Sequence, residues 1–181
     1  GVAVPKSWQY TGDNFAVSSD VGDILYKTDD DTIWTIATNA QRAYKYTSSG
    51  VYTGTSFSTS AVGGITQSIT WDGTYFWVLS YSSRKVGKYT AAGSYTGDSF
   101  SVSTLTTPVG VAWDGTYFWL CDSSNDKVYR YTASGNYDSF NFNTSSQITK
   151  LKDIVYDGSD LWAIDRDAGG VYKYTTGGSY T

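Results

Sequence analysis

Two sets of side chains in this sequence could carry chemistry, and the first is a set of carboxylates. Asp122 and Asp165 end two matching apolar segments, and Asp153 lies inside another. Hard cations such as Ca²⁺ take six or more oxygen ligands, so these three residues are the candidate metal ligands. The alternative is structural. In that interpretation Asp122 and Asp165 cap polar turns, and Asp153 pairs with Lys150 or Lys152.

The second set is aromatic. Trp71, Trp113 and Tyr156 stand directly before recurrent Asp-Gly pairs, and Trp8 lies near the start of the sequence. Aromatic faces beside Asp and Asn side chains suit sugar rings, whose C–H faces stack and whose hydroxyls need fixed polar partners. These four residues are the candidate ligand-binding residues. The alternative for Trp71, Trp113 and Tyr156 is packing, because each shares strand parity with apolar residues.

Composition removes several classes of function. The 181 residues include no His and one Cys, so Ser-His-Asp triads, Cys-His dyads, His-bound zinc and internal disulfides are excluded. The formal net charge is −4 and no basic run occurs, which argues against a nucleic-acid surface. No apolar stretch approaches the length of a membrane span. We therefore predict no catalytic residues and a protein that is not an enzyme.

The elements that must position these residues form a fourfold repeat. A Trp recurs at spacings of 43, 42 and 43 residues, and a basic residue followed by Tyr recurs in the same phase. The Trp residues are Trp34, Trp77, Trp119 and Trp162, and the basic residues are Lys45, Lys88, Arg130 and Lys173. The units cover about 20–58, 62–103, 106–144, and 148–175 together with 10–17.

Each unit is predicted to form four short antiparallel strands. In the third unit, 109–113 and 117–122 flank Asp114-Gly115, a hairpin signal in which both central residues should tolerate positive φ. The segment 117–122 is apolar on both parities, as expected for a strand covered on both faces. Four-stranded units of this length are typical of β-propeller blades, so we predict an all-β, four-bladed propeller of one domain.

The ends of the sequence suggest how the ring closes. Residues 10–17 closely match 95–102, an outer strand, whereas the fourth unit reaches its own outer strand only at Tyr180. We predict that 10–17 pairs with 170–175 and closes the last blade, which would hide two sheet edges. The same strand could instead pair with a neighbouring molecule and give a strand-swapped dimer or filament.

Further expectations follow from the equivalent positions of the repeat. The innermost strands should place Leu25, Ser68, Gly110 and Asp153 around the axis. The four basic residues could form a cationic belt for an anionic partner, or lie solvated with their stems over apolar surface. Cys121 aligns with Leu79 and Ile164 and is predicted to be a core residue.

The third unit carries a family resemblance. Its segments Pro108–Gly115, Phe118–Asp122 and Asn125–Tyr131, followed by Gly135, resemble an NHL-type propeller repeat. The second and fourth units follow more loosely, and the first is the most divergent, with Lys27–Asp31 in place of the aromatic-Asp-Gly turn. Propellers similar to this type include protein-binding modules, lectins, sugar lactonases with a channel metal, and secreted or phage-tail adhesion proteins. NHL propellers usually have six blades, whereas this sequence has four repeats. The resemblance implies the fold and, through the lactonases, a candidate axial Ca²⁺.

Together these observations favour a non-enzymatic recognition or structural module. We expect it to act outside the cell or on a virion or cell surface, because the sequence is rich in Ser, Thr, Tyr and Gly and low in charge. Its partner would be a protein or a glycan, with self-association also open. The alternatives are a strand-swapped structural subunit of a filament or virion, and a metal-dependent lactonase-like enzyme.

Overall fold

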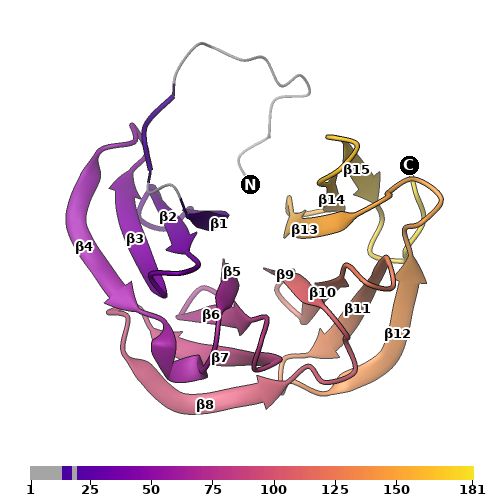
Figure 1. Ribbon diagram of the computed structural model, residues 1–181, viewed down its shortest axis with the longest axis horizontal. Helices are drawn as coiled ribbons and strands as arrows, with labels where there is room; N and C mark the ends of the chain where they lie inside the picture. The colour runs from indigo at the N-terminus through magenta and orange to yellow at the C-terminus, as the bar shows by residue number, and fades with distance from the viewer. Residues whose placement is uncertain (1–13, 18–19) are drawn as a thin grey trace.

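The computed structural model describes residues 14–17 and 20–181, and it has the predicted all-β propeller arrangement of four blades around a common axis (Figure 1). The first two blades comprise β1 (Val21–Lys27), β2 (Thr32–Ala37), β3 (Arg42–Thr47) and β4 (Tyr52–Ser58), then β5 (Thr66–Trp71), β6 (Tyr75–Ser80), β7 (Lys85–Thr90) and β8 (Tyr95–Ser101). The last two comprise β9 (Pro108–Trp113), β10 (Tyr117–Asp122), β11 (Lys127–Thr132) and β12 (Tyr137–Asn143), then β13 (Leu151–Tyr156), β14 (Leu161–Asp165) and β15 (Val171–Tyr174).

Neighbouring strands of each blade pair antiparallel in chain order, with the first strand innermost. The prediction of four strands is confirmed for blades 1 to 3. Blade 4 is a sheet of three strands, and an isolated bridge between Tyr174 and Tyr180 marks where a fourth would begin. A short 3₁₀ helix, η1 (Ser60–Val62), links blades 1 and 2. Among the described residues, no helix is long and apolar enough to cross a membrane.

The core lies between blades and not within them. Three apolar clusters each join two consecutive blades, and we call each of these interfaces a seam. Trp119, Leu120 and Cys121 are fully buried, so β10 is covered on both faces as its sequence predicts. Burial raises the pKa of the Cys121 thiol well above its usual value, which makes this residue an inert part of the core.

The same contact between a Phe and a Gly recurs at the outer part of every seam. Phe57 of blade 1 lies against Gly93 of blade 2 and stacks on Tyr89 at 5.5 Å between ring centroids. Gly93 has a φ of 82°, and the approach of Phe57 leaves no room for a Cβ. The other seams repeat this contact as Phe100 on Gly135 and Phe142 on Gly178.

Phe15 makes the equivalent contact with blade 1, against Gly50 and Tyr46. It therefore occupies the place that the outer strand of a preceding blade would fill. The predicted closing strand 10–17 lies mostly outside the described residues, and its described part, 14–17, forms no strand. Closure of the ring by pairing with 170–175 remains a prediction.

The Asp-Gly turns differ from the prediction in one respect. Only the Gly has positive φ, as at Gly115 with 96°, whereas the preceding Asp has an ordinary backbone conformation. The Asp114 carboxylate accepts hydrogen bonds from the backbone N–H groups of Thr116 and Tyr117. It also accepts one from Trp119 Nε1 at 2.7 Å. The turn thus fixes the repeating Trp, and the turns at Asp72 and Asp157 do the same.

Candidate functional site

The axis is lined by the four innermost strands, and its first-blade residue differs from the prediction. The register pairs Asp23 with Ile36, as it pairs Ser68 with Leu79 and Asp153 with Ile164. Asp23 therefore takes the axial position, and the assignment of Leu25 is wrong by two residues. The turn of the first unit, at Thr28–Asp31, is longer than an Asp-Gly turn. Alignment of the units on their repeating Trp therefore places the axial residue of the first unit two positions too late.

Asp23 and Asp153 are both buried at the axis and hydrogen-bond to each other. Asp23 Oδ2 also accepts hydrogen bonds from Ser68 Oγ at 2.7 Å and from the Ile69 backbone at 2.8 Å. Burial raises the pKa of both carboxyls, and the charge of Asp23 raises that of Asp153 further. Two buried carboxyls in contact favour a state in which they share one proton. Because Asp23 belongs to blade 1 and Asp153 to blade 4, this hydrogen bond joins the two blades at the axis.

Asp122 and Asp165 hold loops at the end of the propeller where the innermost strands begin. Asp122 accepts backbone hydrogen bonds from Thr106, Thr107 and Ser124. Asp165 accepts backbone hydrogen bonds from three residues, which are Thr149, Asp167 and Ala168. Burial alone would raise the pKa of Asp165, but these hydrogen bonds outweigh it and lower the pKa to about 2. Both carboxylates therefore act as caps.

The three candidate metal ligands do not meet. Asp153 lies on the axis, whereas Asp122 and Asp165 point into their own loops. Across residues 14–17 and 20–181, no three His, Cys, Asp or Glu side chains are grouped so that they could hold an ion. The expected ion pair of Asp153 with Lys150 or Lys152 is also replaced, because Asp153 bonds to Asp23.

The loops held by Asp122 and Asp165 surround a cavity of about 400 Å³, which we call the axial mouth. It lies where the innermost strands of blades 2, 3 and 4 begin. Its lining is predominantly polar and contains several hydroxyl groups. The lining residues are Gln67, Tyr81, Thr107, Val109, Ser123, Ser124, Lys150, Leu151, Lys152 and Arg166.

Three cations border the axial mouth, and they are only partly neutralised. Arg166 Nε pairs with Asp167 Oδ1 at 2.8 Å, and both side chains are exposed. Lys150 Nζ donates to the Ser123 carbonyl oxygen at 3.2 Å. Within the described part of the chain, neither Lys150 nor Lys152 forms an ion pair. The mouth is therefore a local positive site in a protein of net charge −4.

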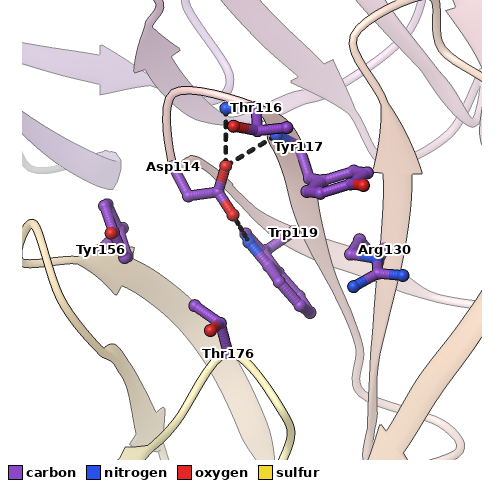
Figure 2. A pocket seen from close by; sticks show the side chains of 7 residues that line it. All are labelled: Asp114, Thr116, Tyr117, Trp119, Arg130, Tyr156 and Thr176. Atoms are coloured by element: carbon purple, nitrogen blue, oxygen red, sulfur yellow. Dashed lines mark hydrogen bonds between the residues drawn. The ribbon is translucent and has the colours of Figure 1, made fainter.

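The opposite end of the propeller holds a smaller pocket of about 220 Å³ between blades 3 and 4 (Figure 2). Tyr156 and Thr176 line it from blade 4, and Asp114, Trp119 and Arg130 are among the residues that line it from blade 3. Of the predicted ligand-binding residues, Tyr156 alone belongs to this pocket. Burial raises the pKa of its phenol, and the charge of Asp114 adds to the effect.

The other aromatic candidates pack against the apolar clusters of the seams. Within its own blade, Trp71 also contacts Phe76 at 4.7 Å and Trp113 contacts Phe118 at 4.5 Å between ring centroids. Trp71 and Trp113 therefore lie where the packing alternative places them. Trp8 lies outside the described residues.

The fourfold basic residues do not form an unpaired belt. Arg130 stacks over Tyr117 at 4.4 Å and pairs with Asp138 at 2.7 Å. Lys45, Lys88 and Lys173 likewise lie over the Trp of their own blade and pair with Asp side chains. Each of these four charges is paired with an Asp of the same chain, in contrast to those of Lys150 and Lys152 at the axial mouth.

Sequence reasoning missed the axial mouth as a site. Its cations occur in the fourth unit only, where Lys152 occupies the position of Gln67 and Val109. A search for residues repeated in every unit passes over them. The sequence signal for this site is a departure from the repeat, namely two lysines at the start of the fourth unit's innermost strand whose counterparts in the second and third units are uncharged.

The fold and its two ends define the class of protein as a β-propeller, and comparison with known proteins supports this at the level of fold. No family model and no curated protein matches the chain. A streptogramin B lyase structure matches 90% of the chain with a TM-score of 0.63 at 16% identity, and the match covers 54% of that protein. A structure of virginiamycin B lyase from Staphylococcus aureus matches 89% of this chain with a TM-score of 0.63 at 16% identity, and the match covers 54% of that protein.

A structure of the WD40 repeats of RRP9 is similar to the same degree. It gives a TM-score of 0.64 at 14% identity and covers 92% of this chain and 51% of that one. The chain thus spans about half the length of the solved propellers that it matches. At these identities the likeness shows the fold alone.

Proposed function

We propose that this propeller is a non-enzymatic recognition module whose axial mouth binds an anionic glycan. The observation that carries the proposal is the placement of Lys150, Lys152 and Arg166 around one polar cavity of about 400 Å³. Long cationic side chains around a shared cavity favour an anionic group, because they stabilise it from several sides.

The remaining lining favours a sugar over a compact inorganic anion. Thr107, Ser123 and Ser124 provide hydroxyls that can exchange hydrogen bonds with sugar hydroxyls. Tyr81 is 40% exposed at the rim and offers an aromatic face for a pyranose ring. A carboxylated or sulfated saccharide would use all three features at once.

Asp122 and Asp165 support the proposal by fixing the loops of the mouth before any ligand arrives. Each accepts several backbone hydrogen bonds from the segments that carry Thr107, Ser124 and the residues beside Lys150. A pre-formed site loses less conformational freedom on binding than a mobile one does. Placement on a cell or particle surface, as the composition suggests, would bring such a mouth to acidic glycans.

The test is a glycan array followed by calorimetry with an oligogalacturonate, a sulfated oligosaccharide and a neutral oligosaccharide of equal length. We expect binding of an acidic member only, weakening as salt screens the exposed charges. Lys152→Gln should reduce affinity about tenfold, equivalent to about 1.4 kcal/mol. Lys85→Gln, which removes a lysine at the start of the third strand of blade 2, should leave binding unchanged.

Two outcomes would refute the proposal. One is equal binding of neutral and acidic sugars, and the other is acidic binding that Lys85→Gln weakens as much as Lys152→Gln does. Binding of an acidic peptide in place of every glycan would assign the mouth to a protein partner. The lactonase-like alternative has no supporting observation among the described residues, since the axial carboxylates bond to each other and to backbone or hydroxyl donors.

A further inference from the structure

Within residues 14–17 and 20–181, the first and last blades each leave uncovered a face that every internal seam buries. At the seams the innermost strand contributes Ile69, Val111 and Ile154, which are at most 2% exposed. The equivalent residue of blade 1 is Ile24, which is 56% exposed. Its neighbour Tyr26 is 54% exposed.

Blade 4 shows the complementary half of a seam. Val155 is 46% exposed, whereas its counterpart in blade 3, Ala112, is buried in a seam. Val171 is 61% exposed, although the equivalent Val128 is fully buried. The two open faces lie on either side of the gap between β1 and β13 in Figure 1.

We propose that these faces join two copies of this chain head to tail, with blade 4 of one copy packed on blade 1 of the next, so that the contact of Asp23 with Asp153 is made between copies. The interface would continue the three seams already present, using the same positions and the same residue types. Because the two faces differ, the contact is heterologous, and its repetition closes a ring or extends a filament.

Phe15 supports a partner of this kind at blade 1. It fills the outer part of the seam on Tyr46 and Gly50, as Phe57 does at the next seam. The outer half of the blade 1 face is thus already arranged as a seam, and its inner half at Ile24 is exposed. A blade from a second copy would cover that inner half.

Sedimentation velocity over a hundredfold range of protein concentration tests the proposal. We expect the wild-type chain to associate, and Ile24→Asp and Val155→Asp each to weaken association about tenfold or more, because each places a charge in an apolar contact. Ile65→Asp is the matched control, since Ile65 is 41% exposed just before β5 of blade 2, an internal blade that contributes to neither open face, and it should associate as the wild type does. Circular dichroism verifies that each variant is folded.

Mixing the two weakened variants distinguishes a head-to-tail contact from a symmetric one. Each variant retains one intact face. A mixture of Ile24→Asp and Val155→Asp should therefore form dimers between the intact blade 4 face of the first variant and the intact blade 1 face of the second, with no larger assemblies. A wild-type chain that stays monomeric at every concentration would overturn the proposal, and so would association that neither variant weakens or a mixture that forms no dimer.

Discussion

Replacement of Trp119 by Phe tests the hydrogen bond that links each Asp-Gly turn to its Trp. Trp119 is fully buried, and its Nε1 donates to the Asp114 carboxylate at 2.7 Å. Loss of a hydrogen bond to a charged acceptor costs about 1.5–3 kcal/mol, and truncation of the ring adds about 1 kcal/mol. We therefore expect Trp119→Phe to lower the free energy of unfolding by about 2.5–4 kcal/mol.

The chain contains a matched control in Trp34. This residue is also buried and also lies beneath a basic side chain, with Lys45 Nζ 5.8 Å from its ring, but its first-unit turn has no Asp-Gly pair. Its buried Nε1 has no hydrogen-bond partner among the residues that the structure describes. Trp34→Phe removes an unsatisfied donor, worth about 1–3 kcal/mol, which offsets the loss of ring volume. We expect this variant to be as stable as the wild type, or slightly more stable.

Equilibrium denaturation in guanidinium chloride, followed by far-UV circular dichroism, measures both variants without relying on Trp fluorescence. The prediction is a difference of about 2 kcal/mol or more between the two substitutions. Equal losses for Trp34→Phe and Trp119→Phe would show that ring volume alone matters. The role assigned to Asp114 would then be wrong.

Two further predictions concern the carboxylates that border the axis. Burial raises the pKa of Asp153 in the folded protein above the pKa that this carboxyl has in the unfolded chain. Its contribution to stability is therefore fully present below the unfolded pKa and is lost as pH rises through the folded pKa. Asp153→Asn should therefore raise the melting temperature at pH 7 and have little effect near pH 3, and a lower melting temperature at pH 7 would contradict this. Asp165, with its pKa lowered to about 2, contributes stability above about pH 4 that is lost as pH falls toward 2. Asp165→Asn should thus destabilise the protein at pH 7, and thermal melts between pH 5 and pH 2 should show its difference from the wild type shrinking, whereas a constant difference would refute the assignment.

Much of the fold could be predicted because blade packing imposes a period on the sequence. The recurring Trp, the Asp-Gly turns and the apolar segment 117–122 each have a direct structural cause, and the structure confirms four blades. The position of Asp23 could not be predicted from the same alignment. It depends on the longer turn of the first unit, which places Asp23 two residues before the position that the spacing from Trp34 predicts.

The candidate site was less predictable because it departs from the repeat. Asp122 and Asp165 were predicted as candidate metal ligands, and the capping alternative describes the contacts that they make. The axial mouth depends on which loops those caps bring together, and that information lies in three different blades. The meeting of Asp23 with Asp153 likewise joins residues from the first and last units.

The recurring contact of a Phe with a Gly in the next blade has a consequence for how such proteins change. Each of the first three units presents a Phe on one side, and all four units present a Gly on the other, so these units can follow one another without a new fit having to arise. Duplication or deletion of one unit of 42 or 43 residues would preserve every remaining junction. The number of units in a lineage could therefore drift by gene duplication, while substitution of a single one of these glycines would be selected against.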